Sequence, residues 1–130
     1  MKKTSKEQKT VKKKNTCYYY YMADREIGAS AIYEVIKTMD DIKEMTEFWD
    51  AADVIEIATN EKDTIDIEKI PLFKGEKDKE FLESNGIKSI FSITCEADDV
   101  ALLKKIFAKV KEANGGNVCS DTEDFKPFIV

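Results

Sequence analysis

The sequence predicts an α+β domain: a mixed, mostly antiparallel sheet of about five to seven strands, with about three helices on one face. Short runs rich in β-branched and aromatic residues alternate with segments whose apolar residues recur at helical spacing, which predicts both element types. A chain of 130 residues forms one domain and is long enough to bury a core without disulfides or metal. The final strand–helix–strand portion suits half of a ferredoxin-like sandwich, so we expect that arrangement in the C-terminal half.

The first two segments are predicted as strands. Residues 16–22 (TCYYYYM) are aromatic and β-branched, and residues 29–37 (ASAIYEVIK) are rich in Ile, Tyr and Val. A helix is the alternative for the second segment, because four apolar residues recur at helical spacing: Ile32, Val35, Ile36 and Met39. Thr38 favours the strand, since Thr38 and Asp41 have the form of an N-terminal capping box, with Asp in the place usual for Glu. We therefore expect a helix to begin after residue 38.

That helix is expected over residues 39–51. Its apolar face would carry Ile42, Met45, Phe48 and Trp49. Residues 54–59 (VIEIAT) and 64–70 (TIDIEKI) then predict a hairpin around a polar turn, and Pro71 ends it.

The C-terminal half contains the clearest helix signals. Residues 76–84 predict a short helix that ends at Asn85 and Gly86, and residues 87–95 predict a central strand with apolar residues on both faces. Residues 98–113 carry an apolar stripe with acids at the start and lysines towards the end, which a helix dipole favours. Residues 117–120 predict a short strand, and the apolar terminus 125–130, with Pro127, suits a sheet edge.

Charge is divided sharply along the chain. Residues 1–15, which we call the lysine tail, hold seven lysines and one acid, a net charge of +6. Residues 16–130 hold 14 Lys+Arg against 25 Asp+Glu, a net charge of −11. The tail has too few apolar side chains to offset its ordering entropy, so we expect a disordered basic tail (1–15) followed by one acidic domain (16–130).

The lysine tail has several possible roles. It is a candidate for binding nucleic acid or an anionic membrane surface, or for folding back on the acidic domain, or it serves solubility alone. Its candidate residues are Lys2, Lys3, Lys6, Lys9, Lys12, Lys13 and Lys14. Nucleic acid is a candidate partner only through this tail, because the acidic domain would repel phosphate.

Residue types that are absent or rare exclude several chemistries. Without histidine, the chain cannot build a Ser-His-Asp or Cys-His catalytic system or a His-ligated metal site. Three scattered cysteines, an odd number, argue for reduced thiols inside a cell, so we expect a cytoplasmic protein. Cys95 is interpreted as a buried core residue, because no histidine is available as its base and neighbouring acids oppose thiolate formation. We expect no cofactor and no membrane span.

Two acidic turns are the candidate sites on the domain. The first turn carries Glu96, Asp98 and Asp99, and the second carries Asp121, Glu123 and Asp124. If the sheet order brings these turns together, their carboxylates could hold Mg²⁺ or Ca²⁺, although neither turn has the spacing of a calcium loop. The simpler interpretations, which we favour, are pairing with a helix dipole for the first turn and a solvated turn for the second.

Four consecutive tyrosines form the most conspicuous local feature. On a strand, Tyr18 and Tyr20 point to one face of the sheet and Tyr19 and Tyr21 to the other. One pair packs under helices, while the pair on the open face could stack bases or a peptide. We favour the interpretation that Tyr18 and Tyr20 simply cover a half-exposed sheet.

These observations favour a small cytosolic, non-enzymatic binding module whose acidic surface docks a basic protein partner. An inhibitor or immunity-type protein that masks a basic toxin or nuclease is one concrete form. The alternatives are a Mg²⁺- or Ca²⁺-dependent enzyme acting on a phosphate-containing substrate through the clustered carboxylates, and a nucleic-acid-associated protein working through the lysine tail.

Overall fold

A six-stranded antiparallel sheet organises the chain in the computed structural model, which describes residues 15–122 and 124–130. Its strand order is β2-β3-β4-β5-β1-β6, and every neighbouring pair is antiparallel. The strands are β1 (Thr16–Ala23), β2 (Thr46–Trp49), β3 (Val54–Ala58), β4 (Thr64–Ile70), β5 (Ser89–Glu96) and β6 (Asn117–Ser120). The helices are α1 (Ala29–Ile36), α2 (Glu76–Ser84) and α3 (Val100–Asn114), which confirms the α+β class. At 8, 9 and 15 residues, these described helices are too short to cross a membrane.

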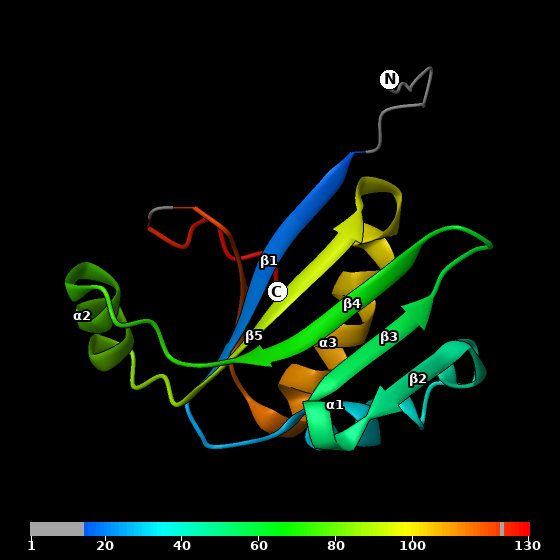
Figure 1. Ribbon diagram of the computed structural model, residues 1–130, viewed down its shortest axis with the longest axis horizontal. Coiled ribbons are helices and arrows are strands. Elements are labelled where there is room, and N and C mark those ends of the chain that lie inside the picture. Colours follow the sequence, from blue (N-terminus) through cyan, green and yellow to red (C-terminus); the bar gives the residue numbers. More distant parts are fainter. Residues whose placement is uncertain (1–14, 123) are drawn as a thin grey trace.

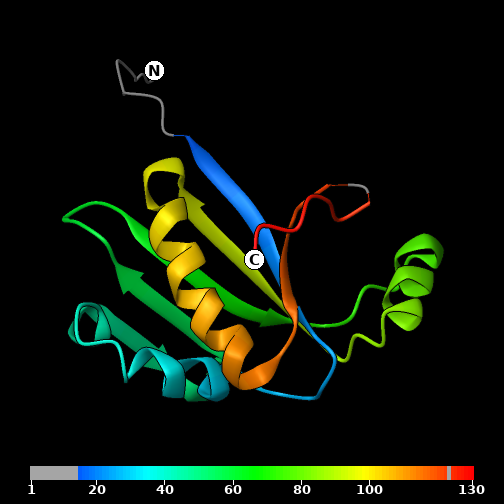
Figure 2. The ribbon, with the colours of Figure 1, turned by 180° about the vertical axis from the view of Figure 1, so that it is seen from behind.

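Two of the helices form a layer on one face of the sheet. Figure 2 shows α3 lying diagonally across the strands with α1 beside it, whereas α2 lies beyond one end of the sheet. The strands β5 and β6, which α3 connects, are not neighbours in the sheet. β1 lies between them and pairs with both. The finer expectation of a ferredoxin-like C-terminal half stays a prediction.

The main core lies between the sheet and the layer of α1 and α3. Alternate strand residues point into it, and the apolar stripe expected on α3 meets them. The burial of one isoleucine, leucine, valine or phenylalanine side chain contributes about 1.5–3 kcal/mol to the stability of the fold. Its fully buried members include Ile32, Ile36, Ile55, Ile57, Ile65, Ile67, Phe91, Leu103, Ile106, Phe107 and Val110.

A second, smaller core lies on the other face of the sheet, at the end where α2 sits. Its buried residues are Met22, Leu82, Ile90, Cys119 and Phe125. Aromatic rings pack around them, with Phe73 stacked on Phe125 at 5.7 Å between ring centres. The segment containing α2 and the C-terminal loop therefore cover one end of this face and leave the rest open (Figure 1).

Ala29–Ile36 forms helix α1, so the strand expected over residues 29–37 is wrong. Ala29, Ile32 and Ile36 are buried on one side of the helix, which means that helical spacing outweighs the β propensity of the segment. The helix start has no side-chain cap of its own; instead, the Ala29 N–H donates to Asp53 Oδ1 at 2.8 Å. Thr38 lies past the helix end, where its hydroxyl donates to the Val35 carbonyl at 2.7 Å. Thr38 therefore closes α1 and does not begin a second helix.

The helix expected over residues 39–51 is also wrong. The chain makes a 3₁₀ turn (Lys43–Met45), the short strand β2 and a second 3₁₀ turn (Asp50–Ala52). Phe48 reaches the core side, where its ring stacks on Tyr33 at 4.7 Å, while Met45 is 50% exposed. The apolar spacing there was misleading because antiparallel pairing with the next strand, β3, fixes this segment as a strand. The strands and helices expected from residue 54 onward are confirmed, with boundary shifts of a few residues.

Gly116 offers a sharp test of this packing. A Cβ there would lie 2.5 Å from the Met22 carbonyl oxygen and 2.8 Å from the Tyr21 ring, and the residue has a φ of +83°. We expect Gly116→Ala to lower the free energy of unfolding by about 3 kcal/mol or more, since overpacking adds to backbone strain. The matched control is Gly86→Ala, where φ is +64° but no atom lies within 4 Å, and about 1 kcal/mol is expected. If urea denaturation shows equal losses of stability in the two variants, the close approach of Gly116 to Met22 and Tyr21 is contradicted.

Candidate functional site

The open face of the sheet is the candidate site. Figure 1 looks directly onto it, with α1 and α3 behind the strands. Because side chains alternate along each strand, the residues beside the buried isoleucines point to this open side. We call it the acidic face, defined by five carboxylates and two exposed rings: Glu47, Glu56, Asp66, Glu68, Glu96, Tyr18 and Trp49.

Strand register brings three of these carboxylates into one row. Glu47 on β2 lies opposite Glu56 on β3, and Glu56 lies opposite Asp66 on β4. The row continues through Thr94 on β5 to Tyr18 on β1. Neighbouring strands are about 4.8 Å apart, so like charges stand side by side across three strands.

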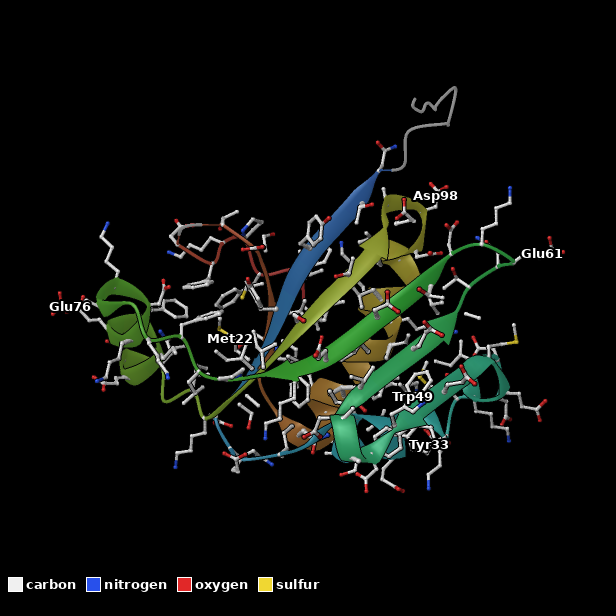
Figure 3. The ribbon with its side chains drawn as sticks, viewed as in Figure 1. Met22, Tyr33, Trp49, Glu61, Glu76 and Asp98 are labelled. Carbon is white, nitrogen blue, oxygen red and sulfur yellow. The ribbon has the colours of Figure 1, made fainter. Side chains whose placement is uncertain are left out.

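A second row crosses the same face of the sheet, two residues further along each strand. It runs from Trp49 through Val54, Glu68 and Ser92 to Tyr20. Trp49, on the edge strand β2, is 45% exposed, and Tyr18, on β1, is 57% exposed. The two exposed rings therefore flank the carboxylates, and Figure 3 shows Trp49 on β2.

No positive charge compensates this face among the described residues. The one basic residue within the six strands is Lys69, whose neighbours along β4 place it on the helix side, and it pairs with Glu26 at 2.6 Å. None of the five carboxylates forms an ion pair with a lysine or arginine in residues 15–122 and 124–130. Carboxylates placed opposite one another cost stability, about 0.2–1 kcal/mol per pair, so this arrangement is not explained by folding.

The first acidic turn lies at the end of β5. Glu96 is on the acidic face, where its carboxylate accepts a hydrogen bond from the Thr16 hydroxyl at 3.0 Å. Asp98 and Asp99 lie in a 3₁₀ turn just before α3, and Figure 3 shows Asp98 at that end of the sheet. Asp99 occupies the N-cap position, but its carboxylate accepts from the Thr59 hydroxyl at 2.9 Å and does not cap the helix.

The second acidic turn follows β6. The Asp121 N–H donates to the Tyr18 carbonyl, and the Asp121 carboxylate lies near the Tyr20 hydroxyl. Burial is the larger cause, and this carboxylate a further one, of a raised pKa of Tyr20. Asp124 is exposed and accepts from the Thr122 hydroxyl at 3.2 Å, whereas Glu123 lies outside the described residues.

The two turns lie at the same end of the sheet but are separated by β1. They follow β5 and β6, which flank β1, so about 10 Å of sheet lies between them. In the part of the chain that the structure describes, no three Asp, Glu or Cys side chains form a group that could hold a metal ion. The described carboxylates of these turns therefore do not form the metal site that the metal-enzyme alternative requires.

The tyrosines divide between the two faces as expected. Tyr21 is fully buried, and its hydroxyl donates to the Gly115 carbonyl at 2.6 Å. Tyr20 is half-buried, with Phe73 edge-on at 5.3 Å, so its ring is covered. Of these two candidates on the open face, Tyr18 is therefore the more exposed, and a stacking role for either ring stays a prediction.

Two cavities lie away from the acidic face. One, of about 140 Å³, lies between α2 and the end of β1 and is lined by Met22, Phe81 and Cys119 among others. It is smaller than the roughly 300 Å³ at which small-molecule sites begin. The other, of about 540 Å³, is an open groove between α1 and α3, with Glu34 and Lys109 on its walls. The carboxylates of the two turns line neither cavity.

The seven candidate lysines of the tail, residues 2 to 14, lie outside the described residues. Comparison with known proteins gives no match: no family model, no curated protein and no solved structure matches the chain. The candidate site therefore depends on the geometry of the acidic face alone.

Sequence reasoning found the two turns but missed most of the acidic face. The clean alternation of β4 already marked Asp66 and Glu68 as outward-pointing. The sequence analysis placed Glu47 in a helix expected over residues 39–51, so it missed the row in which Glu47 stands opposite Glu56 and Glu56 opposite Asp66.

The cysteines provide a test of the buried position of Cys95. Burial raises the pKa of the Cys95 and Cys119 thiols to about 11, and both are buried, whereas Cys17 is half-exposed. Their thiolate fractions near neutral pH are then about a hundredfold lower than that of an ordinary thiol. We expect a thiol reagent to modify Cys17 first and the other two only on unfolding. Fast modification that persists in a Cys17→Ser variant would contradict this.

The row of carboxylates predicts an unusual stability effect. In a chain whose seven tail lysines are changed to glutamine, so that no tail charge offsets the repulsion, replacing the central member of the row by Glu56→Gln should raise the free energy of unfolding by about 0.5 kcal/mol at low salt, because two repulsions are removed. The gain should disappear at about 1 M salt, where the Debye length is about 3 Å. Urea denaturation at both salt concentrations measures it. The control is Glu80→Gln on α2, whose stability should not depend on salt in this way; a loss of stability in Glu56→Gln would contradict the repulsion.

Proposed function

We propose that this protein is a non-enzymatic binding module that docks a basic protein surface through its acidic face. The observation that carries the proposal is the row formed by Glu47, Glu56 and Asp66, with which no lysine or arginine in residues 15–122 and 124–130 forms an ion pair. Repelling carboxylates on neighbouring strands weaken the free protein but are relieved when lysine or arginine side chains of a partner approach them.

The exposed rings suit the same partner. Trp49 and Tyr18 flank the carboxylates, and aromatic faces attract lysine and arginine side chains. Tryptophan and tyrosine are also the residues that most often dominate binding energy at protein interfaces. A face with acidic side chains between two rings therefore favours a basic protein surface over a neutral one.

The two acidic turns extend this surface at one end of the sheet. Glu96 is part of the acidic face itself, and Asp98, Asp121 and Asp124 add exposed carboxylates nearby. Their negative potential would accelerate the encounter with a positively charged partner and would be screened by salt. An inhibitor or immunity-type protein that masks a basic toxin or nuclease is the concrete form that we favour.

Binding of an oligolysine peptide by the full chain tests the proposal. We expect the affinity to fall as salt rises, and the triple variant Glu47→Gln, Glu56→Gln, Asp66→Asn to bind about tenfold more weakly at low salt. This magnitude follows from about 0.5 kcal/mol for each lost pair, together 1.5 kcal/mol. Titration calorimetry measures both effects.

A matched control separates the acidic face from net charge. The variant Glu76→Gln, Glu80→Gln, Glu83→Gln removes the same number of charges from α2, which lies beyond the end of the sheet (Figure 1). Its affinity should change far less than that of the triple variant on the acidic face. Equal losses in the two variants, or binding that does not depend on salt, would overturn the proposed site.

A further inference from the structure

The lysine tail and the acidic face complement each other in charge. Residues 1–14 contain seven lysines and one glutamate, while the acidic face has five carboxylates and no described basic residue paired with them. A second copy of the chain would instead bring one acidic face against another and increase the repulsion. A segment of opposite charge is present in the same chain.

The point of attachment also favours contact between tail and face. Residue 15 leads directly into β1, and the Asn15 carbonyl accepts a hydrogen bond from the Ala97 N–H at 2.8 Å. Its neighbour Thr16 contacts Glu96, a member of the acidic face. The tail therefore begins at the border of this face.

The tail is long enough to reach every carboxylate of the face. Fourteen residues span at most about 50 Å when extended. The distance from β1 to β2 is four strand spacings, about 19 Å. A segment of this length can cross the whole face with its lysines distributed along the rows.

We propose that residues 1–14 occupy the acidic face in cis and so compete with a basic partner. The regulatory part of this inference rests on the proposed function. Each lysine–carboxylate pair on an exposed surface contributes little, but the short tether keeps the tail at an effective concentration in the millimolar range. Several weak pairs then suffice to fill the face at low salt, while a partner with more charges displaces the tail.

The first experiment asks whether the tail contacts the face. It uses the full chain and a full-length variant with all seven tail lysines changed to glutamine, each labelled with ¹⁵N. At about 10 mM salt, where the Debye length is about 30 Å, we expect amide shifts of Glu47, Glu56, Asp66 and Glu68 to differ between the two proteins. The differences should vanish at about 1 M salt, and Glu80 on α2 should show none at either concentration.

Two spectral outcomes overturn the proposal. Identical spectra at low salt would mean that the tail does not touch the face. Differences that grow with protein concentration would mean that the tail docks on another copy, not in cis.

The second experiment measures competition with oligolysine. If the tail fills the face in about three quarters of molecules, the glutamine variant should bind about fourfold more tightly at low salt, because the apparent dissociation constant scales inversely with the free fraction. The gain should persist when Glu76, Glu80 and Glu83 are changed to glutamine. It should disappear when Glu47, Glu56 and Asp66 are neutralised, which separates competition at the face from the change in net charge.

The outcomes also distinguish this inference from the proposed function. Equal, salt-dependent affinities of the full chain and the glutamine variant would overturn tail competition and leave the proposed function standing. If neither protein binds oligolysine at all, the proposed function fails, and the spectral differences alone decide whether the tail occupies the face.

Discussion

The register of the antiparallel strands from β2 to β1 is the constraint on which the structure and its candidate site both depend. Side chains alternate between the two faces along each strand. Ile55, Ile57, Ile65 and Ile67 therefore point towards α1 and α3, and the carboxylates between them point to the other side. A slip of one residue in one strand would expose isoleucines and bury acids, at a cost far above the repulsion within the row. The hydrophobic core therefore holds like charges together on the opposite face.

This coupling explains how a small domain can keep an unfavourable surface arrangement. Burial of one isoleucine contributes about 1.5–3 kcal/mol, whereas each repulsive pair costs about 0.2–1 kcal/mol. The second core under α2 adds further apolar burial at one end of the open face and leaves the rows from Glu47 to Tyr18 uncovered. The main core and the row of carboxylates thus lie on opposite sides of one sheet.

Local sequence signals predicted much of the fold, because most elements have strong local periodicity. The hairpin of β3 and β4, the helices α2 and α3 and the central position of β5 all follow from such patterns. The structure of residues 29–51 was not predicted, because interactions outside each segment decide it: the Asp53 carboxylate accepts a hydrogen bond at the start of α1, and pairing with the next strand, β3, fixes β2 as a strand. The candidate site, too, could be predicted only in part from local sequence. The acidic turns are visible in sequence, but the row of Glu47, Glu56 and Asp66 exists only through cross-strand pairing.

Trp49 has a practical consequence. It is the one tryptophan in the chain, it is 45% exposed, and it lies in the same cross-strand row as Glu68. Its indole emission responds to the polarity and charge around it, so the unmodified protein carries an intrinsic optical reporter at the border of the surface that we assign to recognition. Occupation of that surface near Trp49 can therefore be followed in solution without a dye or an engineered label.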